Sequence, residues 1–493
     1  MAATIAGSSL AFIDGSVVNV ALPAIQADLA ARVSDAQWIV NAYMLTLGAL
    51  ILVGGAAGDR FGRRRVCLCG IVLFTAASVA CGLAPNASVL IGARAIQGIG
   101  GALLVPSSLA IISAAFPIAD RGRAIGTWAG ASALTSALGP VLGGWLVDTW
   151  SWRAIFFINL PIGILALLLM ARRVPESRNE VAAGVDWKGG VLAVAGLGLL
   201  TYGLTLVSST VWSNVAVLGL LAGGVLVLLL LLWSEAHTAS PMLPLMLFRS
   251  WSFSGANAMT LLLYFSLSGA LFFVPFDLID IQGYSATQAG AAFLPLSLVM
   301  AALSRWAGGL TTQFGGRLPL VVGPVIAAVG LGLLAVPGMG GSYWTTFFPA
   351  LTVLGFGLAV SVAPLTTTVM HSAGDQYAGA ASGINNATAR VAGLLAVALL
   401  GALAVSAFRA ALDAHLEHLH TATGMAQSLK SEVQKLAQVP VPPFADTATR
   451  QVLRRAIEES FVFSFRIVML ITAAAALMSA LCAQLTIDRV TTR

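Results

Sequence analysis

Asp14 is an ionisable residue in the middle of a long apolar segment. The surrounding residues 12–23 read FIDGSVVNVALP, and the apolar run begins almost at Met1. At about 1.5 Å per residue, a helix starting at Ala2 would place Asp14 roughly 18 Å along, near the centre of a bilayer. A carboxylate there must be neutral, paired or facing water. Because burial favours the uncharged form, Asp14 is a candidate for binding and releasing a proton. The alternative is a structural acid that is hydrogen-bonded within a helix bundle.

Arg94 poses the same problem with the opposite charge. Residues 90–101 read LIGARAIQGIGG, so the arginine also lies in an apolar segment. A guanidinium stays charged, and inside a membrane it needs an acidic partner or a polar cavity. The alternative is that Arg94 reaches the outer interface and only anchors its helix.

A short basic loop joins two other apolar segments. Residues 55–65 read GAAGDRFGRRR and lie between apolar residues 38–57 and 66–84. Glycines permit a tight turn and a close approach of helices. One interpretation is a loop that merely fixes orientation, because basic residues gather in cytoplasmic loops. The fixed spacing of glycines, aspartate and arginines indicates a further role for Gly55, Gly58, Asp59, Arg60, Gly62 and Arg63.

The composition explains why these charges are exceptional. The chain of 493 residues is 58% hydrophobic and 9% charged, whereas soluble domains carry about 25% charged residues. A polytopic membrane protein is therefore expected. The net charge of +6 comes largely from arginines in short loops and does not indicate nucleic-acid binding. The four cysteines predict neither a disulfide framework nor a zinc site, and no Gly-x4-Gly-Lys-[Ser/Thr] loop is present. We expect no cofactor, no metal and no enzymatic activity.

Fourteen apolar segments are long enough to span a bilayer as helices. They divide into an N-terminal six-helix bundle at 1–171, two linker helices with cytoplasmic flanks at 172–252, and a C-terminal six-helix bundle at 253–493. Lys and Arg concentrate in alternate loops, which predicts that both termini are cytoplasmic. The segments are 2–22, 38–57, 66–84, 89–114, 124–147, 154–171, 189–207, 215–233, 253–275, 286–305, 318–336, 344–370, 379–408 and 462–485.

The outer loop at 409–460 is long and nearly neutral. Its apolar residues recur mostly every three or four positions, from Leu412 to Leu436, and a proline-rich break follows. We expect an outer hairpin, with this amphipathic stripe, that lies on the protein or membrane surface. The alternatives are a docking surface for a periplasmic partner or a lid over the exit path. Metal binding by His415, His418 and His420 is less favoured than a solvated polar face.

Two further motifs connect the segments to a known architecture. Residues 308–317 (GGLTTQFGGR) repeat the glycines, the Phe-Gly pair and the final arginine of the 55–65 loop, which indicates two related halves. Two parallel six-helix halves with a site between them are a transporter pattern. The fifth segment carries a register of small residues and a proline, which favours close helix packing and a bend. That register consists of Gly130, Gly139, Pro140, Gly143 and Gly144.

These motifs together resemble the major facilitator superfamily, and in particular its fourteen-helix drug:proton antiporters of the EmrB/QacA type. The resemblance covers most of the chain and is densest in residues 10–165; residues 379–393, which include Arg390, also fit the penultimate helix of that family. It implies a major facilitator fold in a bacterial inner (plasma) membrane. The register in the fifth segment resembles the antiporter motif, which marks exporters.

The resemblance also implies roles for the residues. Asp14 and Arg94 would couple transport to protons, and the 55–65 loop would hold the cytoplasmic side closed. The expected function is proton-coupled multidrug efflux of amphiphilic molecules by alternating access. Alternatives are a dedicated exporter of one endogenous metabolite on the same fold and, remotely, a membrane enzyme or receptor. Candidate substrate-binding residues are Asp14, Asn19, Trp38, Tyr43, Gln97, Phe265 and Asp277.

Asp277 and Asp280 depart from the usual pattern of that family at the outer end of the ninth segment. They would favour cationic substrates if they line the exit; alternatively, they lie among lipid headgroups without a specific role. The expected partners are a small-molecule substrate, protons and the lipid bilayer. A periplasmic adaptor protein is a further candidate, and the sequence does not distinguish a monomer from an oligomer.

Overall fold

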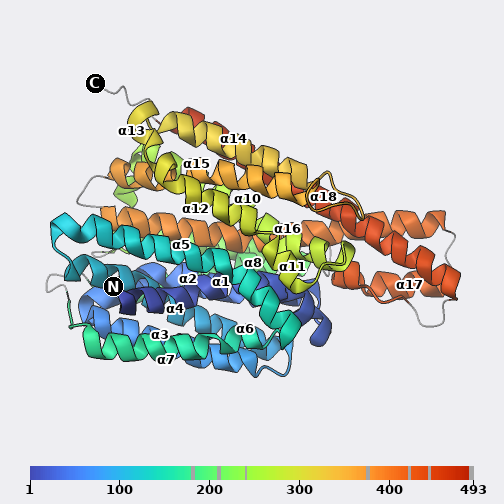
Figure 1. Cartoon of the computed structure of the whole chain (residues 1–493), viewed down its shortest axis with the longest axis horizontal. Helices are drawn as coiled ribbons and strands as arrows, with labels where there is room; N and C mark the ends of the chain where they lie inside the picture. The colour runs from blue at the N-terminus through green and yellow to red at the C-terminus, as the bar shows by residue number, and fades with distance from the viewer. Residues whose placement is uncertain are drawn as a thin grey trace.

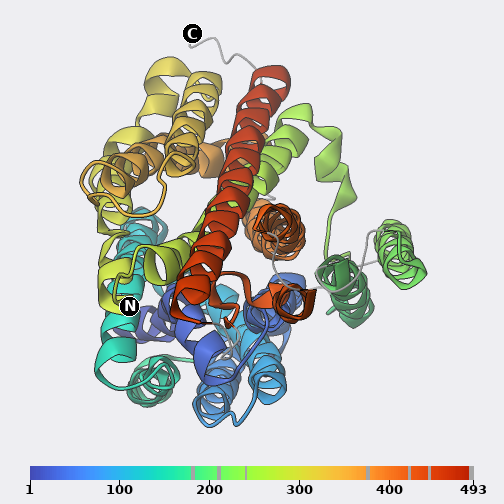
Figure 2. The same ribbon diagram turned by 90° about the vertical axis from the view of Figure 1, so that its right-hand side faces the viewer.

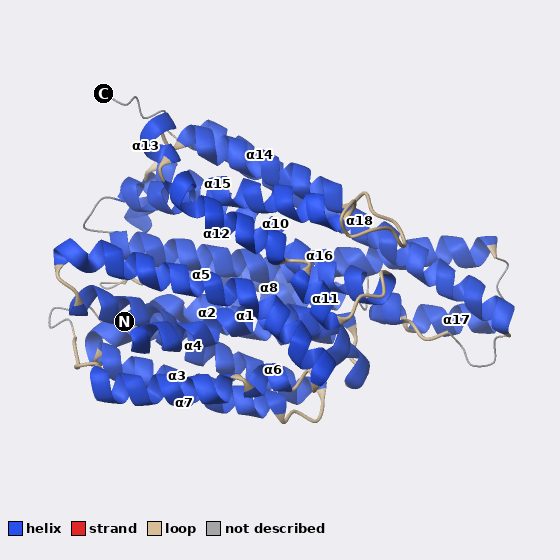
Figure 3. Cartoon of the chain, in the orientation of Figure 1, coloured by secondary structure: helices blue, strands red, loops and turns tan. Residues whose placement is uncertain are grey.

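The computed structural model describes residues 1–178, 184–207, 213–238, 241–373, 378–419, 423–441 and 446–487. These residues form helices and connecting loops, and no strand occurs among them (Figure 3). Thirteen helical segments in this part of the chain are long and apolar enough to cross a membrane. A further long helix, α5 (Ile118–Thr149), takes the place of the fifth predicted segment. The expected all-α, polytopic fold is confirmed.

The N-terminal bundle is built from α1 to α7 (Figure 1). The sixth predicted segment forms as α6 and α7 in succession, which together make one span, Ala154–Arg173, because Ile158 between them keeps helical dihedral angles. In the core of the bundle, α4 packs closely on both α2 and α3. A side chain at Gly100 would lie 2.6 Å from the backbone of Phe74 on α3, so this contact requires glycine. The helices are α1 (Ala2–Asp28), α2 (Val33–Phe61), α3 (Arg63–Gly82), α4 (Ala87–Ala115), α5, α6 (Ala154–Phe157) and α7 (Asn159–Arg173).

Two linker helices, α8 (Trp187–Val207) and α9 (Val215–His237), pack against each other through glycines such as Gly196 and Gly224. Figure 2 shows them as the green pair at the side of the molecule, seen nearly end-on. Much of the surface of α9 consists of exposed leucine and valine side chains. An apolar face of this kind suits contact with lipid.

The C-terminal bundle begins at α10 (Trp251–Phe276), whose end loosens into a π-turn, η2 (Asp277–Ile281). The predicted segment 286–305 is broken into α11 and α12. The other elements are η1 (Leu245–Arg249), α11 (Ala286–Ala291), α12 (Leu294–Gly308), α13 (Leu310–Phe314), α14 (Arg317–Leu334), α15 (Phe347–Ala373), α16 (Ala378–His418), α17 (Thr423–Ser431), η4 (Val433–Gln438) and α18 (Thr447–Thr486).

The outer loop forms a hairpin, but it projects from the molecule instead of lying on its surface as we expected. Helix α16 continues past its predicted end to His418, and α18 already begins at Thr447. The two therefore project beyond the body of the molecule as a helical hairpin, joined by α17 and η4 (Figure 1). Leu412, Leu429 and Leu436 from the predicted stripe are buried inside this hairpin. The apolar stripe therefore packs within the hairpin instead of against another surface.

The η4 turn connects the hairpin to both bundles. Gln438 Nε2 donates to the carbonyl oxygen of Pro23 on α1 at 3.3 Å and to Asp280 Oδ1 on η2 at 3.2 Å. On the other side of the turn, Arg454 Nη1 donates to the carbonyl oxygen of Ala437 at 3.0 Å. Leu436 adopts a left-handed conformation, with φ at 50°. A backbone of this kind needs such surrounding contacts to hold it.

Candidate functional site

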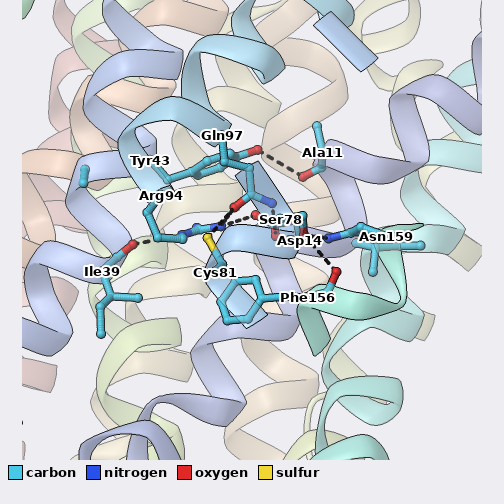
Figure 4. A network of polar contacts seen from close by, with 12 residues as sticks. Ala11, Asp14, Ile39, Tyr43, Ser78, Cys81, Arg94, Gln97, Phe156 and Asn159 are labelled. Carbon is cyan, nitrogen blue, oxygen red and sulfur yellow. Dashed lines mark hydrogen bonds and ion pairs between the residues drawn. The ribbon is translucent and has the colours of Figure 1, made fainter. Parts of the chain in front are cut away.

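Asp14 and Arg94 form one buried network in the N-terminal bundle (Figure 4). Arg94 Nη1 lies 2.5 Å from Asp14 Oδ2 and donates to Gln97 Oε1 at 2.8 Å. Gln97 Nε2 in turn donates to Asp14 Oδ1 at 2.8 Å, and Asn159 Nδ2 lies 3.4 Å from the same oxygen. Helices α1, α4 and α7 thus supply four polar side chains that hydrogen-bond to one another, while the Asn159 Oδ1 atom has no partner among the described residues.

The network is sealed from solvent and lipid. Asp14 is 0% exposed and Arg94 is 1% exposed. The guanidinium lies 4.2 Å from the centre of the Tyr43 ring, and its Nε donates to the carbonyl oxygen of Ile39 at 3.0 Å. The alternative that Arg94 reaches the outer interface is therefore wrong. The acidic partner that its charge required is Asp14.

With Asp14 ionised, the pair is neutral overall, and the carboxylate accepts hydrogen bonds from Arg94 and Gln97. A neutral Asp14 would lose the attraction and leave Arg94 with only neutral acceptors. Because the pair is dry, that difference in electrostatic energy would be large compared with the same pair in water. The geometry therefore makes Asp14 a candidate proton-binding residue.

Sequence reasoning missed the role of Asn159. Besides approaching Asp14, its Nδ2 donates to Ser78 Oγ at 3.0 Å, and Ser78 donates to the carbonyl oxygen of Phe156. The available signal was a carboxamide in the apolar run at the start of the sixth segment. Asn159 is a positioning residue, because it holds the Asp14 carboxylate from the side opposite Arg94.

The antiporter-like register lies where α5 passes between α1 and α11. Gly139 and Gly143 face Ser16 and Val17 of α1, with no room for a side chain. Gly144 faces the carbonyl of Ala286 on α11, so here the two bundles touch backbone to backbone. The surroundings of Gly130 lie outside the described residues.

The same contact continues on its C-terminal bundle side. Gly290 of α11 faces the carbonyl oxygen of Pro140 in the same close way. Asp148 near the end of α5 accepts hydrogen bonds from the backbone N–H groups of Ala286 and Thr287, at 3.1 and 2.7 Å. A carboxylate from one bundle thus caps the first helix turn of the other. We call this contact the α5–α11 seam.

The 55–65 loop is held by charge and by backbone geometry. Asp59 pairs with Arg63 at 2.7 Å, and Gly62 turns the chain with φ at 109°. Glu176 was not singled out from the sequence. Its carboxylate accepts hydrogen bonds from the backbone N–H groups of Arg64 and Arg65 at 3.0 and 3.2 Å, which caps α3.

The remaining loop residues have simpler surroundings. Gly55 faces Pro106, and Gly58 faces Ser107 on α4, so both allow α2 to lie close to that helix. The Arg60 guanidinium lies 5.9 Å from the neighbouring Phe61 ring. In the part of the chain that the structure describes, the hydrogen-bonding and ion-pair partners of Asp59 and Glu176 all belong to the N-terminal half.

The candidate substrate residues do not form one site. Asp14, Tyr43 and Gln97 belong to the buried network. Trp38 packs against Tyr202 of the linker helix α8 instead, with ring centres 6.1 Å apart. Asn19 and Phe265 are only partly buried, on α1 and α10.

Asp277 and Asp280 are occupied by contacts within the protein. Asp277 is buried at the π-turn and accepts a hydrogen bond from Gln282 at 3.3 Å, while Asp280 accepts from Gln438. In the hairpin, His415 Nε2 lies 3.3 Å from Glu459. Within the described ranges no group of three or more His, Cys, Asp or Glu could hold a metal ion.

Two helical bundles that meet at a close seam, one of them holding a buried charge pair, form the architecture of a membrane transporter. The family model described as Major Facilitator Superfamily matches residues 4–398. The chain belongs to the major facilitator superfamily.

Named relatives and solved structures agree with this assignment. Multidrug resistance protein Stp of Mycobacterium tuberculosis is 36% identical over 84% of this chain and 77% of its own length. The tetracenomycin C resistance and export protein of Streptomyces glaucescens is 35% identical over 81% of this chain and 74% of its own. Among solved structures, a bacterial homologue of the lysosomal transporter Spinster aligns with a TM-score of 0.65 at 18% identity, covering 98% of this chain and 95% of that one. The xylose transporter XylE from E. coli aligns with a TM-score of 0.61 at 14% identity, covering 100% and 96%. At these identities the structures support the fold alone.

Proposed function

We propose that this protein is a proton-coupled efflux antiporter that exports amphiphilic small molecules by alternating access. The names of its relatives, which include multidrug resistance and antibiotic export proteins, support drug efflux as the activity. The single observation that carries the proton coupling is the dry Asp14–Arg94 pair, because it is a titratable group whose charge state changes the energy of the bundle.

In this proposal, a proton from outside neutralises Asp14 and releases Arg94 from its ion pair. The bundle then changes its preferred arrangement, and the substrate leaves. Loss of the proton to the cytoplasm restores the pair. A ligand can shift such an equilibrium only by its differential affinity for the two states, and the unequal environments of ionised and neutral Asp14 supply that difference.

The two ends of the molecule would act as gates. The α5–α11 seam supports a role in closing the outer side, since its backbone contacts leave no path between the two helices there. The Asp59–Arg63 pair and the Glu176 cap support a role of the 55–65 loop in closing the cytoplasmic side. Helix α1 begins and α18 ends at the end of the molecule opposite the hairpin (Figure 1). We propose that this end lies in the cytoplasm of a bacterium, because its loops carry most of the basic residues, and that the hairpin lies outside, where an adaptor protein could reach it.

A dedicated exporter of one endogenous metabolite remains the second candidate. Relatives named for single compounds, such as the cephamycin export protein of Amycolatopsis lactamdurans at 36% identity, favour it. Fold and coupling would be the same, so the range of substrates separates the two.

The test uses purified protein in proteoliposomes with an imposed pH gradient and ethidium as the transported dye. We expect gradient-dependent dye movement in the wild type and its loss in Asp14→Asn. Glu417→Gln, which removes an exposed acid from the hairpin, serves as the control and should transport normally. Transport that survives in Asp14→Asn would remove the proton site from the network. A wild type that moves ethidium without a gradient would exclude proton coupling.

A further inference from the structure

Arg390 is a charged residue at mid-membrane depth that the proton network does not use. It lies on α16, and at about 1.5 Å per residue it is roughly 18 Å from the start of that helix at Ala378. Asp14 lies at a similar depth along α1. Both helices begin at the same end of the molecule (Figure 1), so the two charges occupy a similar level.

The side chain of Arg390 starts at the interface between the two bundles. Its Cβ would lie 2.9 Å from a side chain built at Gly48 of α2, so α2 and α16 touch here. Its charge acts electrostatically on Tyr43 of α2 and on Tyr264 of α10. The guanidinium therefore faces both halves of the protein.

Within the described part of the chain, no group balances this charge. Among the residues that the structure describes, none accepts a hydrogen bond from the guanidinium, no carboxylate pairs with it and no aromatic ring stacks on it. Arg94, by contrast, has Asp14 at 2.5 Å and the Tyr43 ring at 4.2 Å. A guanidinium inside a membrane without a counterion is costly, and such residues usually mark a substrate pathway.

The neighbouring surface is polar in a way that suits a bound molecule. Five residues before Arg390 on α16, and about 140° round the helix from it, Asn385 donates to Thr260 of α10 at 2.6 Å. Tyr264 follows Thr260 by one turn on the same face of α10, and the charge of Arg390 acts on it. Arg390 therefore adds a charge beside these neutral hydrogen-bonding groups of α10 and α16.

We propose that Arg390 is the position that binds an oxyanion of the substrate, and that the preferred substrates are amphiphiles bearing a carboxylate. The inference rests on the proposed export function and deepens it. A guanidinium recognises a carboxylate through two parallel hydrogen bonds, and the partly buried Tyr264 offers contact area for an aromatic body. The acids considered for cation binding, Asp277 and Asp280, are engaged by Gln282 and Gln438 instead.

The experiment compares two probes of one shape. N-dansylglycine carries a carboxylate, and N-dansylglycinamide carries an amide in its place. Binding is measured by dansyl fluorescence to protein in nanodiscs, with empty nanodiscs subtracted. We expect the wild type to bind the carboxylate probe about tenfold or more tightly than the amide, as a charge-assisted contact would give.

Variants test whether Arg390 causes the preference. Arg390→Gln should bind the two probes within about twofold of each other, and Arg390→Lys should keep part of the preference because it keeps the charge. Arg249→Gln removes an arginine from η1, away from the bundle interface, and should behave as wild type. Equal binding of the probes by the wild type, no binding of the carboxylate probe, or a preference that persists in Arg390→Gln would overturn the proposal.

Ethidium transport separates this inference from the function on which it rests. If ethidium moves with the pH gradient but no carboxylate preference exists, the export function stands and the anion site is wrong. If the preference exists and is lost in Arg390→Gln, but neither ethidium nor N-dansylglycine moves with the gradient, the anion site stands and proton-driven export is wrong.

Discussion

The two halves of this transporter treat their membrane-embedded charge in opposite ways. The N-terminal bundle pairs Arg94 with Asp14 inside a buried hydrogen-bonding network. The C-terminal bundle leaves Arg390 without a partner among the described residues and turns it toward the bundle interface. A paired charge suits a proton-dependent change of state, whereas an unpaired one can attract a ligand. Under our two proposals, the N-terminal half would couple energy and the C-terminal half would contact the substrate.

The 55–65 loop and its repeat at 308–317 also differ in how they use charge. In the 55–65 loop, Asp59 pairs with Arg63. In the repeated loop, Thr312 and Gln313 replace the acid and the first arginine, and Arg317 binds the backbone and side chain of Gln484 on α18 through neutral acceptors. One half is fastened by charge and the other by neutral hydrogen bonds.

The largest difference in stability is expected between variants in which one or the other membrane-embedded arginine is replaced by glutamine. Arg94→Gln leaves Asp14 buried without its counterion and should lower the free energy of unfolding by about 3–5 kcal/mol. Arg390→Gln removes a charge that has no partner and should not destabilise the protein. Thermal unfolding of both variants in the same detergent measures the difference. Similar losses in the two would contradict the comparison, and Asp14→Asn combined with Arg94→Gln should recover much of the stability.

The α5–α11 seam should be the next most sensitive feature. Gly144→Val places a side chain against the Ala286 carbonyl and prevents the two helices from closing, so transport should fall at least about tenfold. Accessibility of cysteines introduced near the seam should rise. Gly92→Val is the matched control, because nothing lies within 4 Å of that position. A normal rate in Gly144→Val would remove the seam from the cycle.

The loop comparison predicts a smaller effect. Asp59→Asn should slow transport about tenfold without weakening substrate binding, which corresponds to about 1.4 kcal/mol in the balance of states. Gln313→Ala in the repeated loop should stay within about twofold of wild type. Rate and affinity measured in the same proteoliposomes decide this, and equal slowing by the two variants would show that charge is not the difference between the loops.

The smallest effect is expected at the η4 turn, which touches both halves. Gln438→Ala removes the hydrogen bonds to Pro23 and Asp280, each worth about 0.5–1.5 kcal/mol net. The outer side should open more readily, and the transport rate should change by less than about fivefold. Fluorescence from a dye on the hairpin, read at two pH values, reports the opening. No change in either measurement would mean that η4 does not restrain the outer side.

Much of the fold was predictable because the local sequence of each helix marks it as a membrane span. Apolar runs and charged breaks gave the helical spans, and the cost of charge in lipid singled out Asp14 and Arg94. The rotation of each helix about its axis was not predictable, since it depends on packing against several neighbours at once. That is why Trp38 was assigned to a substrate site although it packs on the linker helix α8. It is also why Glu176 and Asn159, which act through contacts distant in sequence, were overlooked.

The length of α16 has a mechanical consequence. It is one helix of 41 residues, so it forms a rod about 60 Å long that runs from the end of the bundle through Arg390 to the hairpin. If the C-terminal bundle tilts by about 10° around its middle, the far end of that rod must swing by about 5 Å. Each transport cycle would therefore move the hairpin tip, and this movement could be detected from outside. A protein that binds the hairpin tightly would hold the transporter in one conformation.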